Sequence, residues 1–150
     1  VSIMGQEEIK GAHGIIVKAD SLFENTDFSE VKMLVLPGGM PGTIHLKEHK
    51  GLEELILKHN EEKKYLAAIC AAPTVFGGMG IQKGKKAICY PGMEEGLTGA
   101  EVTCQPAVTD GHITTSRGLG TAIDFALALI SELRDKESAD TISKQVVYER

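Results

Sequence analysis

A short apolar run that stops at two glycines constrains the fold more than any other feature of this 150-residue chain. Met33–Leu36 is continuously apolar and ends at residues 37–39, a Pro-Gly-Gly turn. Such a run is typical of a parallel-sheet strand that is covered on both faces. A second run, Tyr65–Ile69, passes directly into residues 70–73, Cys-Ala-Ala-Pro, where a helix is expected to begin because proline suits a first turn. Residues 43–63 carry apolar side chains at helical spacing and predict a surface helix.

The rest of the chain continues the alternation of strands and helices. Short strands are predicted at residues 15–17, 87–90, 102–108 and 113–115, and a weaker helical segment from residue 137. Thr121 is expected to cap a helix whose core face comprises Ile123, Leu127, Ile130 and Leu133. This order predicts one α/β domain over residues 1–150 with a doubly wound, mostly parallel sheet. Ligands of such sheets bind at the carboxyl ends of the strands, where both turns named above fall.

Charge and composition exclude several classes of protein. The formal net charge is −5 and no basic stripe is present, which argues against a nucleic-acid partner. No stretch approaches about 18 consecutive apolar residues, so no membrane span is expected. Three cysteines, an odd number in a chain without other secreted character, indicate reduced thiols in the cytoplasm. No Cys or His pair has metal-ligand spacing, and neither a metal nor another cofactor is expected.

Cys70 is the candidate reactive residue because it lies between a strand and a helix. The N–H groups at a helix start stabilise a thiolate, and small neighbours such as Ala71 suit a sharp turn. Gly38 and Gly39 end the neighbouring strand, and a backbone N–H there could complete an oxyanion hole beside the sulfur. The alternative that local spacing leaves open is a buried cysteine packed like a small hydrophobe.

The other cysteines and the histidines show no such placement. Cys89 and Cys104 are expected in mid-strand as packed thiols. His13, just before a predicted strand, is kept as a candidate ligand contact. Three histidines share the predicted surface helix and are expected to face solvent: His45, His49 and His59.

Three motifs, in the same order, closely resemble those of the DJ-1/PfpI (ThiJ) superfamily and of its DJ-1 branch. They are the elbow at residues 66–74, the glycine turn at 35–42, and the late strand and helix start at 110–122. The resemblance implies a flavodoxin-like sandwich, a homodimer, and an oxidisable nucleophilic cysteine at the elbow, Cys70. It also implies an oxyanion hole formed by the backbone N–H groups of Gly39 and Ala71. The candidate pocket is completed by Gly38, His13 and Pro73.

The resemblance implies a cysteine-dependent activity on a small reactive carbonyl, of the glyoxalase or deglycase type. An alternative from a different class is a redox sensor or chaperone, whose cysteine is oxidised under oxidative stress without turnover. A third is an elbow that only binds a small anion. A cysteine protease matches less well, because protease-like members place a histidine directly after the cysteine, and here that residue is Ala71.

Two departures from the family limit what it implies for the site. Many members contribute a histidine from the stretch at 97–103, which has none here; Glu101 is a polar substitute, with a surface glutamate as the alternative. The family's first strand and helix, which carries a glutamate that hydrogen-bonds the cysteine sulfur, precede the point where this sequence begins. Because that strand is central in the sheet, a further N-terminal segment is expected, in a longer chain or as a separate cleaved piece.

Overall fold

The two apolar runs become neighbouring strands of one sheet. A computed structural model describes residues 1–148, in which β3 (Met33–Leu36) pairs in parallel with β4 (Tyr65–Ile69). On its other side β4 pairs in parallel with β8 (Ile113–Ser116), and the tight turn at residues 111–112 brings β7 (Ala107–Asp110) antiparallel to β8. The order β3-β4-β8-β7 confirms the predicted α/β fold with a mostly parallel sheet.

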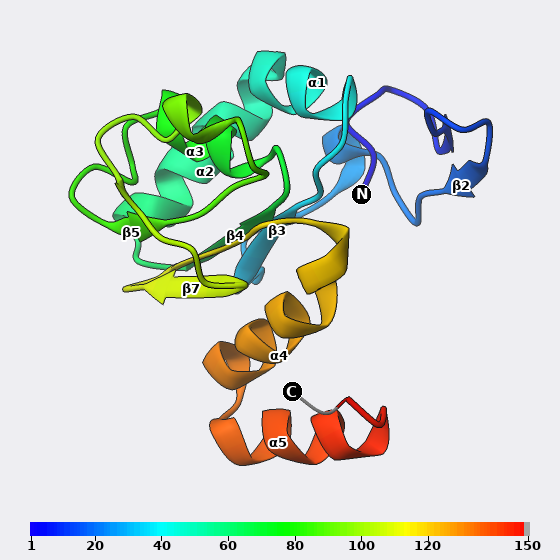
Figure 1. Cartoon of the computed structure of the whole chain (residues 1–150). Coiled ribbons are helices and arrows are strands. Elements are labelled where there is room, and N and C mark those ends of the chain that lie inside the picture. Colours follow the sequence, from blue (N-terminus) through cyan, green and yellow to red (C-terminus); the bar gives the residue numbers. More distant parts are fainter. Residues whose placement is uncertain (149–150) are drawn as a thin grey trace.

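Helices cover both faces of this sheet (Figure 1). On one face lie α1 (Gly42–Glu48), α2 (Lys50–Glu61) and α3 (Pro73–Gly78); on the other lie α4 (Ala122–Leu133) and α5 (Lys136–Gln145). A surface helix is present within residues 43–63 as expected, but His49 adopts an extended conformation and divides the segment into α1 and α2. Its ring Nδ1 accepts the N–H of Leu52 at 3.0 Å and so caps α2.

The main core lies between the sheet and the α1–α3 layer. Leu34 and Leu36 of β3 and Leu66 of β4 pack there against Ile56 and Phe76. His59 of α2 also turns inward and is 1% exposed, so the expectation that it faces solvent is wrong. Burial lowers the pKa of this imidazole, which is therefore neutral in the folded protein at pH 7.

The predicted core face of α4 is only partly buried. Leu127 and Ile130 are half-buried, whereas Ile123 and Leu133 are 45% and 47% exposed. The polar residues of α4 share the opposite side of the helix, as the periodicity predicts. Phe125, at the border between the two sides, is the one residue of α4 that is fully buried.

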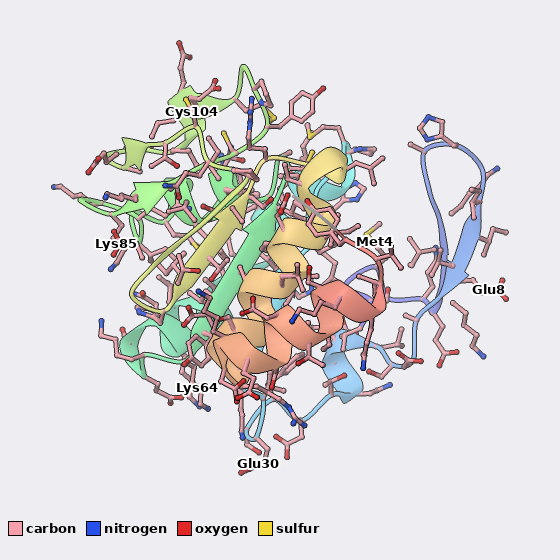
Figure 2. All side chains as sticks on the ribbon, turned by 60° about the horizontal axis from the view of Figure 1, so that its bottom comes forward. Met4, Glu8, Glu30, Lys64, Lys85 and Cys104 are labelled. Carbon is pink, nitrogen blue, oxygen red and sulfur yellow. The ribbon has the colours of Figure 1, made fainter. Side chains whose placement is uncertain are left out.

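The remaining strands are short. β1 (Glu8–Lys10) and β2 (Ile16–Lys18) form a hairpin that projects from the sheet (Figures 1 and 2), while β5 (Lys86–Ala87) pairs in parallel with β6 (Glu101–Val102). The strands expected at residues 87–90 and 102–108 are thus shorter, and the second is divided between β6 and β7. Three 3-10 turns complete the part of the chain that the structure describes: η1 (Phe23–Asn25), η2 (Glu94–Gly96) and η3 (Leu119–Thr121). Across residues 1–148, no helix has the length and apolarity needed to cross a bilayer.

Candidate functional site

Cys70 occupies a strained turn between β4 and α3. Its φ is +65°, in the left-handed region, which costs a residue with a side chain about 1–2 kcal/mol. Two backbone hydrogen bonds hold the turn: the Cys70 N–H donates to the carbonyl of Ser116 at 3.0 Å, and its carbonyl accepts the N–H of Tyr90 at 2.8 Å. The thiol is half-buried, so it remains within reach of a small molecule.

The glycine turn after β3 lies against this elbow. A Cβ on Gly38 would come within 2.5 Å of the Cys70 Cβ and 2.6 Å of the Ile69 carbonyl oxygen, so no side chain fits there. Gly39 has φ +93°, a conformation that favours glycine, and its carbonyl accepts both the N–H and the hydroxyl of Thr43 at 2.9 Å. The structure therefore brings together Gly38, Gly39 and Cys70, which lie 31 to 32 positions apart in the sequence.

Two backbone N–H groups at this junction are available to a ligand. Within residues 1–148, neither the N–H of Gly39 nor that of Ala71 donates a hydrogen bond. The Ala71 nitrogen is 3.1 Å from where a Gly38 Cβ would lie, so the two turns are in direct contact. Free donors beside a thiol can stabilise negative charge that develops on a carbonyl oxygen or on an oxidised sulfur.

The other two thiols have different surroundings. Cys89 is fully buried; desolvation, with smaller contributions from Glu94 and Cys70, raises the pKa of its thiol to about 11. Its S–H donates to the carbonyl of Tyr90 at 3.5 Å. Cys104 lies exposed in the loop after β6 (Figure 2). All three cysteines are free, and only Cys70 combines accessibility with a strained turn.

The remaining predicted residues divide between the elbow and the surface. Pro73 is the first residue of α3 and is buried beneath the elbow. His13 lies exposed in the turn of the β1–β2 hairpin, and within the described chain no hydrogen bond or ion pair joins it to the elbow. Glu101 lies exposed in β6 opposite Lys86, a surface position. In the described part of the chain no cluster of three or more His, Cys, Asp or Glu could hold a metal.

Sequence reasoning missed two residues beside the sulfur. A Cβ on Gly118 would lie 4.0 Å from the Cys70 Sγ and 3.5 Å from the Tyr90 ring. Gly118 follows β8, which pairs with β4, and this pairing places the two strand ends together. The position of Gly118 in the late motif was the one available signal; nothing local pointed to Tyr90.

The fold and the elbow define a class: an α/β protein with a cysteine in a strained strand-to-helix turn, beside a glycine turn with a free N–H. The chain belongs to the DJ-1/PfpI family, whose sequence model matches residues 1–132.

Individual relatives agree with this assignment. The chain is 41% identical to Protein DJ-1 homolog A of Arabidopsis thaliana over 95% of its own length, but spans only 37% of that relative. It resembles the solved structure of Toxoplasma gondii DJ-1 in an oxidized form with a TM-score of 0.91 and 32% identity, covering 97% of this chain and 80% of that one. A deglycase of Pyrococcus abyssi is 35% identical over 73% of this chain and 66% of its own.

Proposed function

We propose that this protein acts on small reactive carbonyls, in the manner of a glyoxalase or deglycase, with the Cys70 thiolate as nucleophile. The observation that carries the proposal is the juxtaposition of a strained, half-buried Cys70 with two unpartnered backbone N–H groups, on Gly39 and Ala71. The similarity to a deglycase of Pyrococcus abyssi supports this substrate class.

Methylglyoxal illustrates the chemistry. The Cys70 sulfur bonds to the aldehyde carbon, and the aldehyde oxygen takes up a proton to give a hemithioacetal. During addition the N–H groups of Gly39 and Ala71 stabilise the charge on that oxygen. A proton then moves from the first carbon to the second and the hydroxyl proton from the first oxygen to the second, so that the first carbon is oxidised to a thioester and the ketone is reduced to an alcohol. Water hydrolyses the thioester and releases lactate and the thiol.

The proton shift requires a base. Across the described residues no side chain hydrogen-bonds the Cys70 sulfur. We propose that the base is the glutamate of the family's first helix, which the resemblance places beside this sulfur. Supply of the base from that segment makes turnover dependent on the full protein.

Substitution Cys70→Ser tests the nucleophile. Lactate production from methylglyoxal by the full protein should fall by about 1,000-fold or more, since a serine hydroxyl is a far weaker nucleophile than a thiolate near pH 7. Cys104→Ser, at an exposed thiol, is the matched control and should retain the wild-type rate. Full activity of Cys70→Ser would rule out the thiolate mechanism.

A second candidate function is redox sensing, with or without a chaperone role. The free N–H groups of Gly39 and Ala71 favour it, because they could donate hydrogen bonds to a sulfinate as well as to an oxyanion. Two equivalents of hydrogen peroxide would convert the thiolate to sulfinate and yield two of water. Peptide mass spectrometry after peroxide treatment separates the functions: double oxygenation confined to Cys70, without glyoxal turnover, favours the sensor. Equal oxidation of Cys70 and exposed Cys104 would count against it.

We also propose that the protein is a homodimer in the cytoplasm. Three free thiols support a reducing compartment.

The dimer is supported by strand β2 of the hairpin, whose exposed Ile16 and Val17 form an apolar surface that a second copy could cover. Light scattering on the purified protein would report a monomer if this part of the proposal is wrong.

A further inference from the structure

A methyl-sized space lies beside the Cys70 sulfur, and Gly118 leaves it open. The φ of Gly118 is 162°, an extended conformation open to any residue, so the backbone does not require glycine here. A Cβ on Gly118 would make ordinary contacts, 3.5 and 3.9 Å from two carbons of the Tyr90 ring and 4.0 Å from the Cys70 Sγ. We name this space, bounded by Gly118, Tyr90 and Cys70, the Gly118 niche.

Backbone hydrogen bonds lock the three walls of the niche together. Tyr90 donates its N–H to the Cys70 carbonyl at 2.8 Å, and Cys70 donates its own to the Ser116 carbonyl at 3.0 Å. Gly118 donates its N–H to the Thr121 hydroxyl at 3.1 Å, and that hydroxyl lies 2.7 Å from the Ser116 hydroxyl. The backbones of the three walls are therefore held relative to one another before any ligand binds, whereas the Tyr90 side chain is 51% exposed.

The walls of the niche suit an alkyl group. They consist of an aromatic ring, a glycine Cα and the sulfur itself, and none carries a formal charge as long as the thiol is protonated or bonded to substrate. In a methylglyoxal hemithioacetal the methyl group is three bonds from the sulfur, which allows it to reach the position of the missing Cβ. Glyoxal has only hydrogen at that position, and phenylglyoxal has a ring.

We propose that the Gly118 niche holds the substituent on the carbon next to the one that Cys70 attacks, and limits it to about the size of a methyl group. The proposal rests on the proposed function and adds that methyl ketoaldehydes are the preferred substrates. Gly118 sets the depth of the niche, and the Tyr90 ring sets its width.

Gly118→Ala tests the depth by filling the niche. The catalytic efficiency kcat/KM of the full protein for methylglyoxal should fall by about tenfold, the usual effect of one misplaced methyl group, while that for glyoxal should change less than about threefold. Gly120→Ala is the matched control, because a Cβ there meets nothing within 4 Å and its φ is not positive. An equal loss for both substrates would overturn the proposal.

A covalent probe tests the niche without turnover. Chloroacetone transfers a CH2–CO–CH3 group to the Cys70 sulfur as chloride leaves and the thiol proton passes to buffer; chloroacetaldehyde transfers CH2–CHO, which has hydrogen in place of the methyl group. The increase in intact mass with time gives the rate of each labelling reaction. A change in the reactivity of the thiol alters both rates alike and therefore cancels in their ratio. Gly118→Ala should lower the chloroacetone-to-chloroacetaldehyde ratio by about tenfold, and Gly120→Ala should leave it unchanged. An unchanged ratio in Gly118→Ala overturns the niche even if wild-type protein makes lactate. A lowered ratio without any lactate overturns the proposed function alone.

Tyr90 provides a second, independent variant. Tyr90→Ala removes the aromatic wall and should raise the ratio of kcat/KM for phenylglyoxal to kcat/KM for methylglyoxal. It should also raise the ratio of the labelling rate by phenacyl chloride to that by chloroacetone. Tyr90→Phe keeps the wall and should leave both ratios at the wild-type value. A change in Tyr90→Phe as large as in Tyr90→Ala would mean that the hydroxyl acts, and not the ring.

Discussion

At the scale of single residues, the backbone of Cys70 is held in the left-handed conformation that favours glycine. Its positive φ costs about 1–2 kcal/mol, and the hydrogen bonds to Ser116 and Tyr90 offset that cost. Gly38 contributes by having no side chain, since a Cβ would meet the Cys70 Cβ at 2.5 Å. The strained turn thus places Cys70 next to the glycine turn, where the N–H groups of Gly39 and Ala71 have no partner.

Cys89 predicts a loss of stability at alkaline pH. Its thiol has a pKa of about 11 in the folded protein against an ordinary value of 9.0, so between these values the unfolded chain loses a proton that the folded protein keeps. Stability therefore falls as pH rises through this window, by at most about 1.4 kcal/mol per pH unit from this group. Urea unfolding at several pH values should show a shallower decline in Cys89→Ala than in wild type. Cys104→Ala, at an exposed thiol, should follow wild type; equal slopes in all three proteins would contradict the assignment.

At the scale of elements, a break divides the helical segment that follows the glycine turn into α1 and α2. His49 makes the break, since its extended backbone ends α1 and its Nδ1 caps α2 through the N–H of Leu52. Its ring also packs against Phe23, with centroids 4.7 Å apart. One side chain thus ties the start of α2 to the segment before β3.

The cap predicts the effect of changing His49. His49→Ala should lower the free energy of unfolding by about 1 kcal/mol or more, because the Leu52 N–H loses its acceptor. His49→Asp restores an acceptor without the ring, so denaturant unfolding should recover the part of the loss that belongs to the cap. No recovery in His49→Asp would assign the whole effect to packing against Phe23.

At the scale of the whole molecule, one edge of the sheet is uncovered. In the described chain β3 pairs only with β4, and its far side borders a groove of about 620 Å3 lined mainly by apolar residues, including Ile3, Phe28 and Leu36. Val35 in the middle of β3 is 48% exposed. On the face opposite to α1–α3, the apolar helix α4 buries only Phe125 completely. Apolar edge strands and the apolar sides of helices are normally covered.

We propose that an N-terminal strand and helix cover this groove, either in a longer chain or as a separate cleaved piece. Protein purified from its natural source should then show an intact mass above 16.1 kDa or a second, co-purifying peptide. In the 150-residue chain expressed alone, the amide hydrogens of β3 should exchange with solvent faster than those of β4, because β4 is paired on both sides. A single well-folded species of 16.1 kDa, without a companion and with protected β3 amides, would contradict the proposal.

The sequence by itself determined the features whose causes are local. The apolar runs of β3 and β4, the glycine turn, and Cys70 between a strand and a proline-led helix are all legible from neighbouring residues, and so was the fold class. The family resemblance pointed to the N–H groups of Gly39 and Ala71, which the structure leaves without partners.

Only the tertiary structure decided what distant segments share. Tyr90 and Gly118 are 20 and 48 positions beyond Cys70, and they reach the sulfur because of β4–β8 pairing and the hydrogen bond from Tyr90. The burial of Phe125 and the inward turn of His59 were likewise beyond periodicity, since Phe125 lies at the border of the apolar side of α4 and a histidine suits either environment. Local patterns specify where a strand or a turn forms; the energy of packing against other elements selects which face is buried and which side chains meet.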